Sequence, residues 1–124
     1  MKFAKRVFLL AGIYGLLVMA PQYFLEGKIG RDYPPPITHP ENFYGFIGVT
    51  LAWQLMFLLI SRDPERYRLA MLPAIVEKFT FWPAVIVLYL QHRVAGSVLG
   101  FGIVDLVLGL LFIESFRRTA PARS

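Results

Sequence analysis

Four long apolar runs occupy most of this 124-residue chain. They are Val7–Leu25 with 19 residues, Phe43–Ile60 with 18, Leu69–Leu90 with 22 and Val94–Ile113 with 20. About 20 mainly apolar residues are needed for a helix to cross the hydrocarbon core of a bilayer. The runs therefore predict an all-α protein, an integral membrane four-helix bundle that forms one transmembrane domain over residues 1–124.

The predicted helices extend slightly beyond these runs. Asp63 followed by Pro64 is typical of a helix start, because aspartate caps the first turn and proline fits within it. Thr38 and Glu41 have the spacing of a capping box before the second helix. The expected helices cover residues 5–25, 41–61, 64–91 and 94–116. The intervening residues 26–40 are expected to form a periplasmic loop, which three consecutive prolines keep extended and stiff.

The composition agrees with a membrane protein, since 56% of the residues are hydrophobic and 17% are charged. The absence of cysteine excludes disulfides and thiolate metal sites. A net charge of +5 could indicate nucleic acid, but the basic residues lie between apolar runs rather than on one face. We therefore expect membrane lipid and no nucleic acid as a partner. We also expect no metal and no cofactor, because no metal or dinucleotide motif occurs.

The basic residues are distributed unevenly between the two ends of the predicted helices. Nine of them fall on one side and only three, Lys28, Arg31 and Arg93, on the other. Because basic loops stay in the cytoplasm, both termini are expected there, in a multi-pass protein of the bacterial inner membrane. The nine are Lys2, Lys5, Arg6, Arg62, Arg66, Arg68, Arg117, Arg118 and Arg123.

Two other interpretations of the apolar runs fit the sequence less well. The first 20 residues resemble a secretory signal peptide, but cleavage after Ala20 would place Pro21 at the first mature position, which is unfavourable. A soluble helical bundle would require polar helix faces, and the first two predicted helices have none. Four membrane spans fit the sequence better than either alternative.

Charged residues interrupt the last two apolar runs near their middle. Glu77 lies about 20 Å along the helix axis from Pro64, and Asp105 lies about 16 Å from Val94, at 1.5 Å per residue. Lys78 therefore also falls within the hydrocarbon. Gln54 and Tyr14 lie at comparable depth in the other two helices, and this predicts one central polar layer (Tyr14, Gln54, Glu77, Lys78 and Asp105).

Energetic cost favours a pairing within this layer. Each charge near the bilayer centre costs about 2.5–3.5 kcal/mol, so an unpaired Lys78 would be unfavourable. We predict an ion pair between Lys78 and Asp105. Glu77 and Lys78 point about 100° apart on a helix and are not expected to satisfy each other. With all three ionised the layer has one surplus negative charge, which favours protonation of a carboxyl or a bound cation.

Small residues near the charges predict close helix contacts in the bundle. Gly102 and Gly109 flank Asp105, while Ala70 and Ala84 share the helix face of Glu77. Phe81, Trp53 and Trp82 are expected to line a pocket, because the two tryptophans lie away from the membrane interface, where they would otherwise form an aromatic belt.

The overall plan resembles small four-helix bacterial membrane proteins of the DoxX-like kind. The shared features are a basic start before "AGIYG", the turn "SRDPERYR" and the acid within "GIVDLVLGLLF". More distantly, the plan is similar to the sterol-isomerase and sigma-2-receptor type of bundle, which binds lipophilic amines or sterols against buried carboxylates. The resemblance implies the fold, and no catalytic residues are carried over from it.

The function predicted from these residues is binding of an apolar or cationic small molecule, such as a quinone, an isoprenoid or a lipid. An ionisable group inside the bilayer is by default a candidate functional site. The alternative is a non-enzymatic assembly or accessory subunit, in a homo- or hetero-oligomer, whose polar layer only fixes helix packing. Proton-coupled transport is a third possibility that would require a wider cavity. No nucleophile–base pair occurs, so an enzyme is not favoured.

Overall fold

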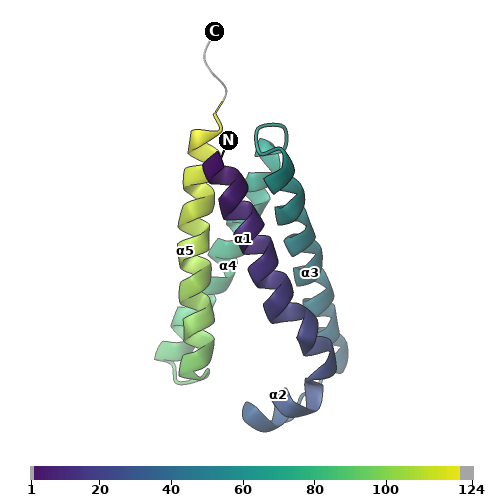
Figure 1. Ribbon diagram of the computed structural model, residues 1–124. Coiled ribbons are helices and arrows are strands. Elements are labelled where there is room, and N and C mark those ends of the chain that lie inside the picture. Colours follow the sequence, from purple (N-terminus) through teal and green to yellow (C-terminus); the bar gives the residue numbers. More distant parts are fainter. Residues whose placement is uncertain (1, 121–124) are drawn as a thin grey trace.

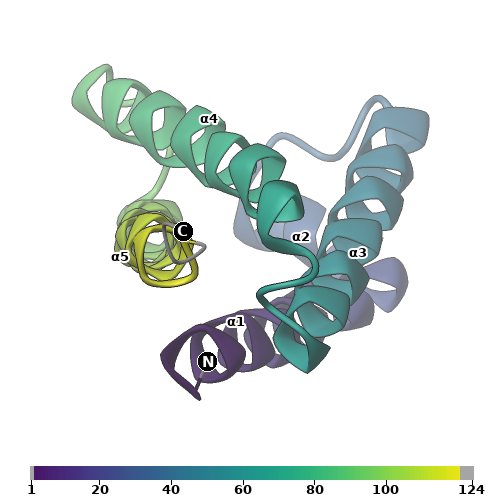
Figure 2. The same ribbon diagram turned by 90° about the horizontal axis from the view of Figure 1, so that it is seen from above.

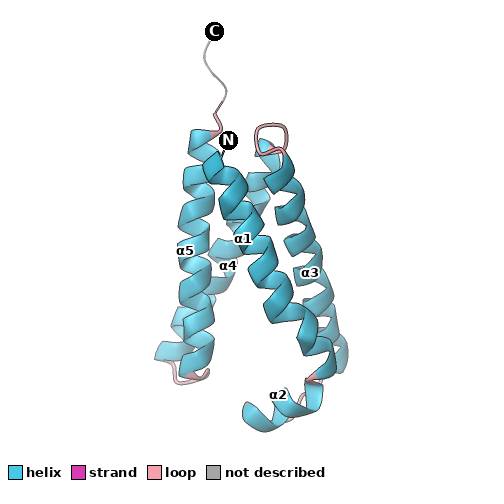
Figure 3. Cartoon of the chain, viewed as in Figure 1, coloured by secondary structure: helices cyan, strands magenta, loops and turns pink. Residues whose placement is uncertain are grey.

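The computed structural model describes residues 2–120, and within them the regular secondary structure is entirely helical. Arg123, counted among the basic residues above, lies outside the described residues. Figure 3 shows the helices with their short connections. Four of these helices are long and apolar enough to cross a membrane, which indicates a multi-pass membrane protein.

The four long helices are joined by short segments, one of which is itself helical. The helices are α1 (Lys2–Met19), α2 (Glu26–Asp32), α3 (Pro40–Arg62), α4 (Met71–Leu90) and α5 (Gly96–Arg118), with 3-10 segments at Ala20–Phe24 and Arg68–Ala70. The 3-10 segment after α1 continues the first candidate span to Phe24. The predicted number and order of the long helices are therefore found in the structure.

The helix expected to begin near Pro64 begins at Met71 instead. Asp63 caps only a single turn, in which its Oδ1 accepts a hydrogen bond of 3.3 Å from the backbone N–H of Arg66. Pro73 explains the interruption, because proline lacks the N–H needed to continue a helix through this position. The helix restarts so that Pro73 falls within its first turn, where that N–H is not required.

The segment expected to be a loop contains α2. Glycine at position 30 lets this short helix fold back against the prolines that follow it, since a Cβ at Gly30 would lie 3.2 Å from the Cα of Pro36. Lys28 and Asp32 are spaced four apart and form an exposed ion pair on the helix. The prediction that all of residues 26–40 would be extended is therefore wrong for this part.

The predicted capping box at the start of α3 is also wrong. His39 occupies the N-cap position, and no side chain caps the helix. The Glu41 carboxylate lies 3.2 Å from Nδ1 of His39 rather than reaching back to the backbone. Pro40 sits at the first helical position, where its missing N–H is of no consequence.

The long helices form two pairs that separate toward one end of the bundle. α1 packs mainly on α3 and α4 mainly on α5, while α1 and α5 connect the pairs. The pairs converge where α1 begins and α5 ends, and they diverge toward α2 (Figure 1). The view along the bundle shows α3 and α4 pointing away from each other (Figure 2). The long helices are therefore close together at one end and further apart at the other.

The convergent end contains the aromatic core. The rings of Phe8 and Phe112 are stacked with their centroids 4.3 Å apart, and Phe57 meets Phe112 edge-on at 5.0 Å. All three side chains are fully buried, together with Met71 and Ala74. Aromatic pairs in these geometries stabilise a core beyond their buried area. This cluster holds the two helix pairs together at the end that carries most of the basic residues.

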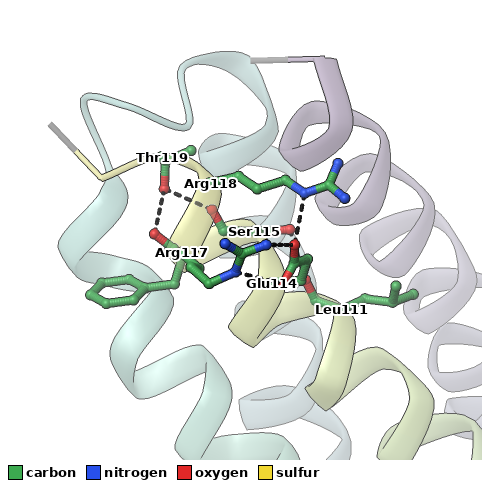
Figure 4. Close-up of polar contacts among 7 residues, drawn as sticks. Leu111, Glu114, Ser115, Arg117, Arg118 and Thr119 are labelled. Carbon is green, nitrogen blue, oxygen red and sulfur yellow. Dashed lines mark hydrogen bonds and ion pairs between the residues drawn. The ribbon is translucent and has the colours of Figure 1, made fainter. Parts of the chain in front are cut away.

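Polar contacts complete this end of the bundle (Figure 4). Glu114 accepts hydrogen bonds from both Arg117 and Arg118 in the last turns of α5. Ser115 donates to the carbonyl of Leu111, and Thr119 donates to the carbonyl of Ser115, each at 2.8 Å. These contacts satisfy polar groups near the end of α5 and include no side chain of the predicted polar layer.

The beginning of α1 and the end of α5 lie at the same end of the bundle, as an even number of spans requires (Figure 1). The Arg118 guanidinium lies 4.1 Å from the ring centroid of Phe3, and the Arg68 guanidinium lies 3.6 Å from that of Phe116. Of the nine basic residues counted on this side, the eight that the structure describes lie at this end. The side of the membrane that this end faces stays a prediction.

Candidate functional site

The predicted ion pair between α4 and α5 is confirmed. Lys78 Nζ donates a hydrogen bond of 3.2 Å to Oδ1 of Asp105. Lys78 is 4% exposed, so its side chain is buried within the bundle. Its ammonium also lies 5.3 Å from the ring centroid of Phe57, at the edge of the aromatic core. A buried ammonium in this position depends on its carboxylate partner.

Glu77 lies closer to Lys78 than the sequence suggests. Lys78 Nζ is 3.6 Å from Oε2 of Glu77, because the flexible lysine stem overcomes the angle between neighbouring residues. The expectation that these two residues could not pair is therefore wrong for the charge contact. It is right for the hydrogen bond, since Oε2 accepts none among residues 2–120. Glu77 is therefore held by a charge contact alone, and its side chain remains 22% exposed.

Of the two neighbouring charged residues of α4, Lys78 lies in the interface with α5 and Glu77 does not. The buried residues of α4 are Met71, Ala74, Lys78 and Val85. Ala84, on the face of Glu77, is exposed, so the prediction that it contacts a neighbouring helix is wrong. The face of α4 that contacts α5 therefore includes Lys78 and not Glu77, which differs by one residue from the predicted face. Glu77 points away from the α4–α5 interface.

Two glycines of α5 make room for this face, as predicted. A Cβ at Gly102 would lie 2.8 Å from Cγ1 of Val85, and one at Gly109 would lie 3.3 Å from Cβ of Lys78. Small residues allow membrane helices to approach closely. This close approach brings the Asp105 carboxylate within reach of the lysine.

Gln54 is part of the buried interior but has a different partner. Its Nε2 donates a hydrogen bond of 2.8 Å to the carbonyl of Thr50 in its own helix. A Cβ at Gly15 of α1 would lie 1.9 Å from its Oε1, so the amide is held against α1 at a position that only glycine permits. Gln54 therefore packs α3 closely against α1. It makes no hydrogen bond with the charged residues of the polar layer.

A cavity of about 1170 Å³ lies between the two helix pairs. All four long helices line it, and α2 contributes at the divergent end. Seven of the predicted site residues are in its lining, namely Tyr14, Trp53, Gln54, Glu77, Lys78, Phe81 and Asp105. The polar layer therefore borders a space large enough for a small molecule.

Trp82 does not line this cavity, contrary to the prediction. Glu77 and Phe81 share a helix face at a spacing of four residues, whereas the next residue points about 100° away. The Trp82 ring packs edge-on against Phe79, with centroids 5.4 Å apart. Its indole N–H is buried, and no acceptor for it occurs in the part of the chain that the structure describes.

The walls of the cavity are mostly apolar, and its charged residues lie in two places, namely the polar layer and the divergent end, where Asp32 and Arg93 contribute. Val18, Met19, Val49, Val98 and Phe101 contribute to the lining beside the polar layer. Within residues 2–120, no cluster of three or more histidine, cysteine or acidic side chains is arranged to hold a metal ion. The arrangement favours an apolar molecule with one polar group that can donate a hydrogen bond to Glu77.

A contact at the divergent end could not be predicted from the sequence. Tyr33, directly after α2, shares a hydrogen bond of 2.7 Å with Ser97 in the first turn of α5. Ile29 and Tyr33 both line the cavity from this side. A contact between residues 64 positions apart leaves no pattern in a single sequence.

Comparison with protein-family models, with curated proteins and with solved structures finds no match to this chain. The resemblance to DoxX-like proteins therefore stays a prediction.

Proposed function

We propose that this protein binds a lipophilic small molecule in the cavity between its two helix pairs, within the bacterial inner membrane and with both termini in the cytoplasm. The ligand is an apolar or cationic molecule, such as a quinone, an isoprenoid or a lipid. The main support is the Glu77 carboxylate, which lines the cavity with a side chain that is 22% exposed and whose Oε2 has a charge contact with Lys78 but no hydrogen bond within the described residues. A carboxylate can accept several hydrogen bonds, so its exposed part can accept one from a ligand.

The neighbouring groups have distinct roles in this proposal. Lys78 and Asp105 already satisfy each other, so they fix the position of Glu77 and set the local charge. Phe81 and Trp53 provide aromatic surface for the apolar part of the ligand. Binding is then determined by one polar contact in an apolar cavity, as is usual for small-molecule sites.

An accessory subunit is the second candidate, and the Lys78–Asp105 pair is the observation that favours it. A buried ion pair that is satisfied within the protein can fix helix register without binding anything. In that case the cavity is filled by ordinary lipid and Glu77 has no specific role. The two candidates differ in what a change at Glu77 does.

The test is mass spectrometry of small molecules that co-purify after gentle detergent extraction. We expect a specific lipophilic molecule with the wild type and its loss from Glu77→Gln, whose helix content is unchanged. Glu114→Gln is the matched control, because it makes the same chemical change outside the cavity lining. Equal retention by Glu77→Gln and Glu114→Gln would contradict the proposed site and favour the accessory subunit.

A further inference from the structure

The divergent end of the cavity is covered by α2. Leu25, Ile29 and Tyr33 are spaced by four residues, so they share one face of this short helix, and all three line the cavity. Lys28 lies on the exposed side, where it pairs with Asp32. Figure 1 shows α2 lying across the open end of the bundle. The side of α2 toward the cavity is therefore mainly apolar, and Asp32 is the acidic residue of this helix that also borders the cavity.

One hydrogen bond links this cover to the opposite helix pair. α2 follows α1 in the chain and leads to α3, whereas Ser97 belongs to α5. The 2.7 Å contact between the Tyr33 and Ser97 hydroxyl groups therefore bridges the two pairs where they are furthest apart. Both side chains are exposed, so water can compete for this bond and it is easily broken.

The sides of the cavity, unlike its divergent end, are bordered by large apolar side chains of the long helices. Phe46 and Val49 of α3 line the cavity and are also 53% and 63% exposed. Phe101 of α5 lines it as well and is 44% exposed. Because these large apolar side chains both line the cavity and are exposed on the protein surface, they lie at the edge of the cavity. In a bilayer their exposed surface contacts acyl chains, so these edges are favourable for lipid and unfavourable for water.

α3 and α4 lie on different sides of the cavity and have few contacts with each other. α3 packs on α1 and α4 packs on α5, and the two point apart in the view along the bundle (Figure 2). From this arrangement we infer that the cavity admits molecules sideways from the bilayer between the two helix pairs, while α2 and its Tyr33–Ser97 hydrogen bond close it to water. The ligand is then a molecule dissolved in the bilayer, with an acyl or isoprenoid chain that lies between α3 and α4. This inference deepens the proposed function and rests on it for the ligand's identity, but the access route is tested separately.

The first experiment uses tryptophan fluorescence in bilayers whose lipids are brominated on the acyl chains. Trp82→Phe leaves Trp53, which lines the cavity, as the only reporter. The outward control is Leu55→Trp in a chain with both native tryptophans replaced by phenylalanine, because Leu55 is on the same helix and 60% exposed. We expect bromine to reduce Trp53 fluorescence nearly as much as that of the control. Fluorescence of Trp53 that bromine leaves unchanged would overturn lateral access, including the case in which a second copy of the chain covers the gap.

The second experiment measures access from water. The chain has no cysteine, so Phe81→Cys places a single thiol in the cavity and Thr38→Cys a single thiol in the exposed loop. A charged, water-soluble thiol reagent should label Phe81→Cys much more slowly than Thr38→Cys. Adding Ser97→Ala removes one hydrogen bond, so we expect it to speed labelling of Phe81→Cys by about 2- to 10-fold and leave Thr38→Cys unchanged.

Two results would overturn the closing role of α2. Labelling of Phe81→Cys as fast as that of Thr38→Cys would show a cavity open to water, and an unchanged rate with Ser97→Ala would show that the hydrogen bond closes nothing. Neither experiment requires a bound ligand. A failure of lateral access is therefore distinguishable from the loss of ligand retention that tests Glu77.

Discussion

The replacement of Asp105 by asparagine tests how the buried lysine is stabilised. Lys78 Nζ is hydrogen-bonded to Asp105 at 3.2 Å and lies 3.6 Å from Glu77 Oε2. At an effective dielectric constant of about 20, each contact corresponds to roughly 5 kcal/mol of Coulomb attraction. The two carboxylates are therefore nearly equal as countercharges, and the hydrogen bond distinguishes them.

Removing one partner of a buried ion pair costs about 3–5 kcal/mol, mostly because the other charge remains buried. Glu77 is still present in Asp105→Asn, but the neutral asparagine oxygen accepts a weaker hydrogen bond from the ammonium than the carboxylate does. We therefore expect the free energy of unfolding to fall by a smaller amount, about 2–3 kcal/mol. Glu77→Gln leaves the hydrogen bond between the ammonium and the Asp105 carboxylate intact, so it should cost less than Asp105→Asn.

The measurement is reversible unfolding in mixed micelles with increasing dodecyl sulfate, followed by helical circular dichroism. Asp105→Leu and Lys78→Met complete a double-mutant cycle. The double variant should be more stable than either single variant, because it leaves no unpaired ammonium. Equal effects of Asp105→Asn and Glu77→Gln, or an additive cycle, would show that the Lys78–Asp105 contact does not stabilise the bundle.

Two further predictions concern packing, and both use the same unfolding measurement. Gly15→Ala should lower the free energy of unfolding by about 1–3 kcal/mol, because the new Cβ overlaps the buried side chain of Gln54. Gly100→Ala has open space around its Cβ, so it should be neutral or stabilise by up to about 1 kcal/mol, and equal effects of the two changes would refute the close contact. Trp82→Phe should change stability by no more than about 1 kcal/mol, because it removes a buried N–H without an acceptor among the described residues. A large loss would show that the indole N–H contributes to stability and would contradict this interpretation.

The number of long apolar helices and the main ion pair could be predicted from the sequence for one physical reason. The hydrocarbon core has a fixed thickness, so span length and the depth of Lys78 and Asp105 follow from residue counts. A buried charge also has few possible partners, and this restricts the pairing. Gly102 and Gly109 could be assigned to the interface because close helix approach requires small residues.

The rotation of each helix could not be predicted in the same way. In a soluble helix the polar face identifies the exposed side, but lipid and protein interior are both apolar, so that signal is lost. This is why Ala84 and Trp82 were assigned to the wrong faces. The start of α4 was misplaced because Asp63 and Pro64 mark one capped turn, and Pro73 then limits how far a continuous helix extends.

The covering helix was missed for a different reason. Residues 26–32 are short and polar and carry two glycines, so their helical propensity is low. α2 is held by contacts from outside, namely Gly30 against Pro36 and Tyr33 with Ser97. Contacts of this kind depend on the folded bundle and have no local signature.

Solid-state nuclear magnetic resonance in lipid bilayers gives the most direct test of the buried polar layer. The dipolar coupling between the labelled Nζ of Lys78 and the carboxyl carbon of Asp105 reports their separation. We predict the strong coupling of a direct contact, with the ammonium protected from exchange with bulk water. An absent coupling, or a lysine ammonium in rapid exchange with water at the headgroups, would contradict a charged layer inside the bundle and, with it, the candidate site at Glu77.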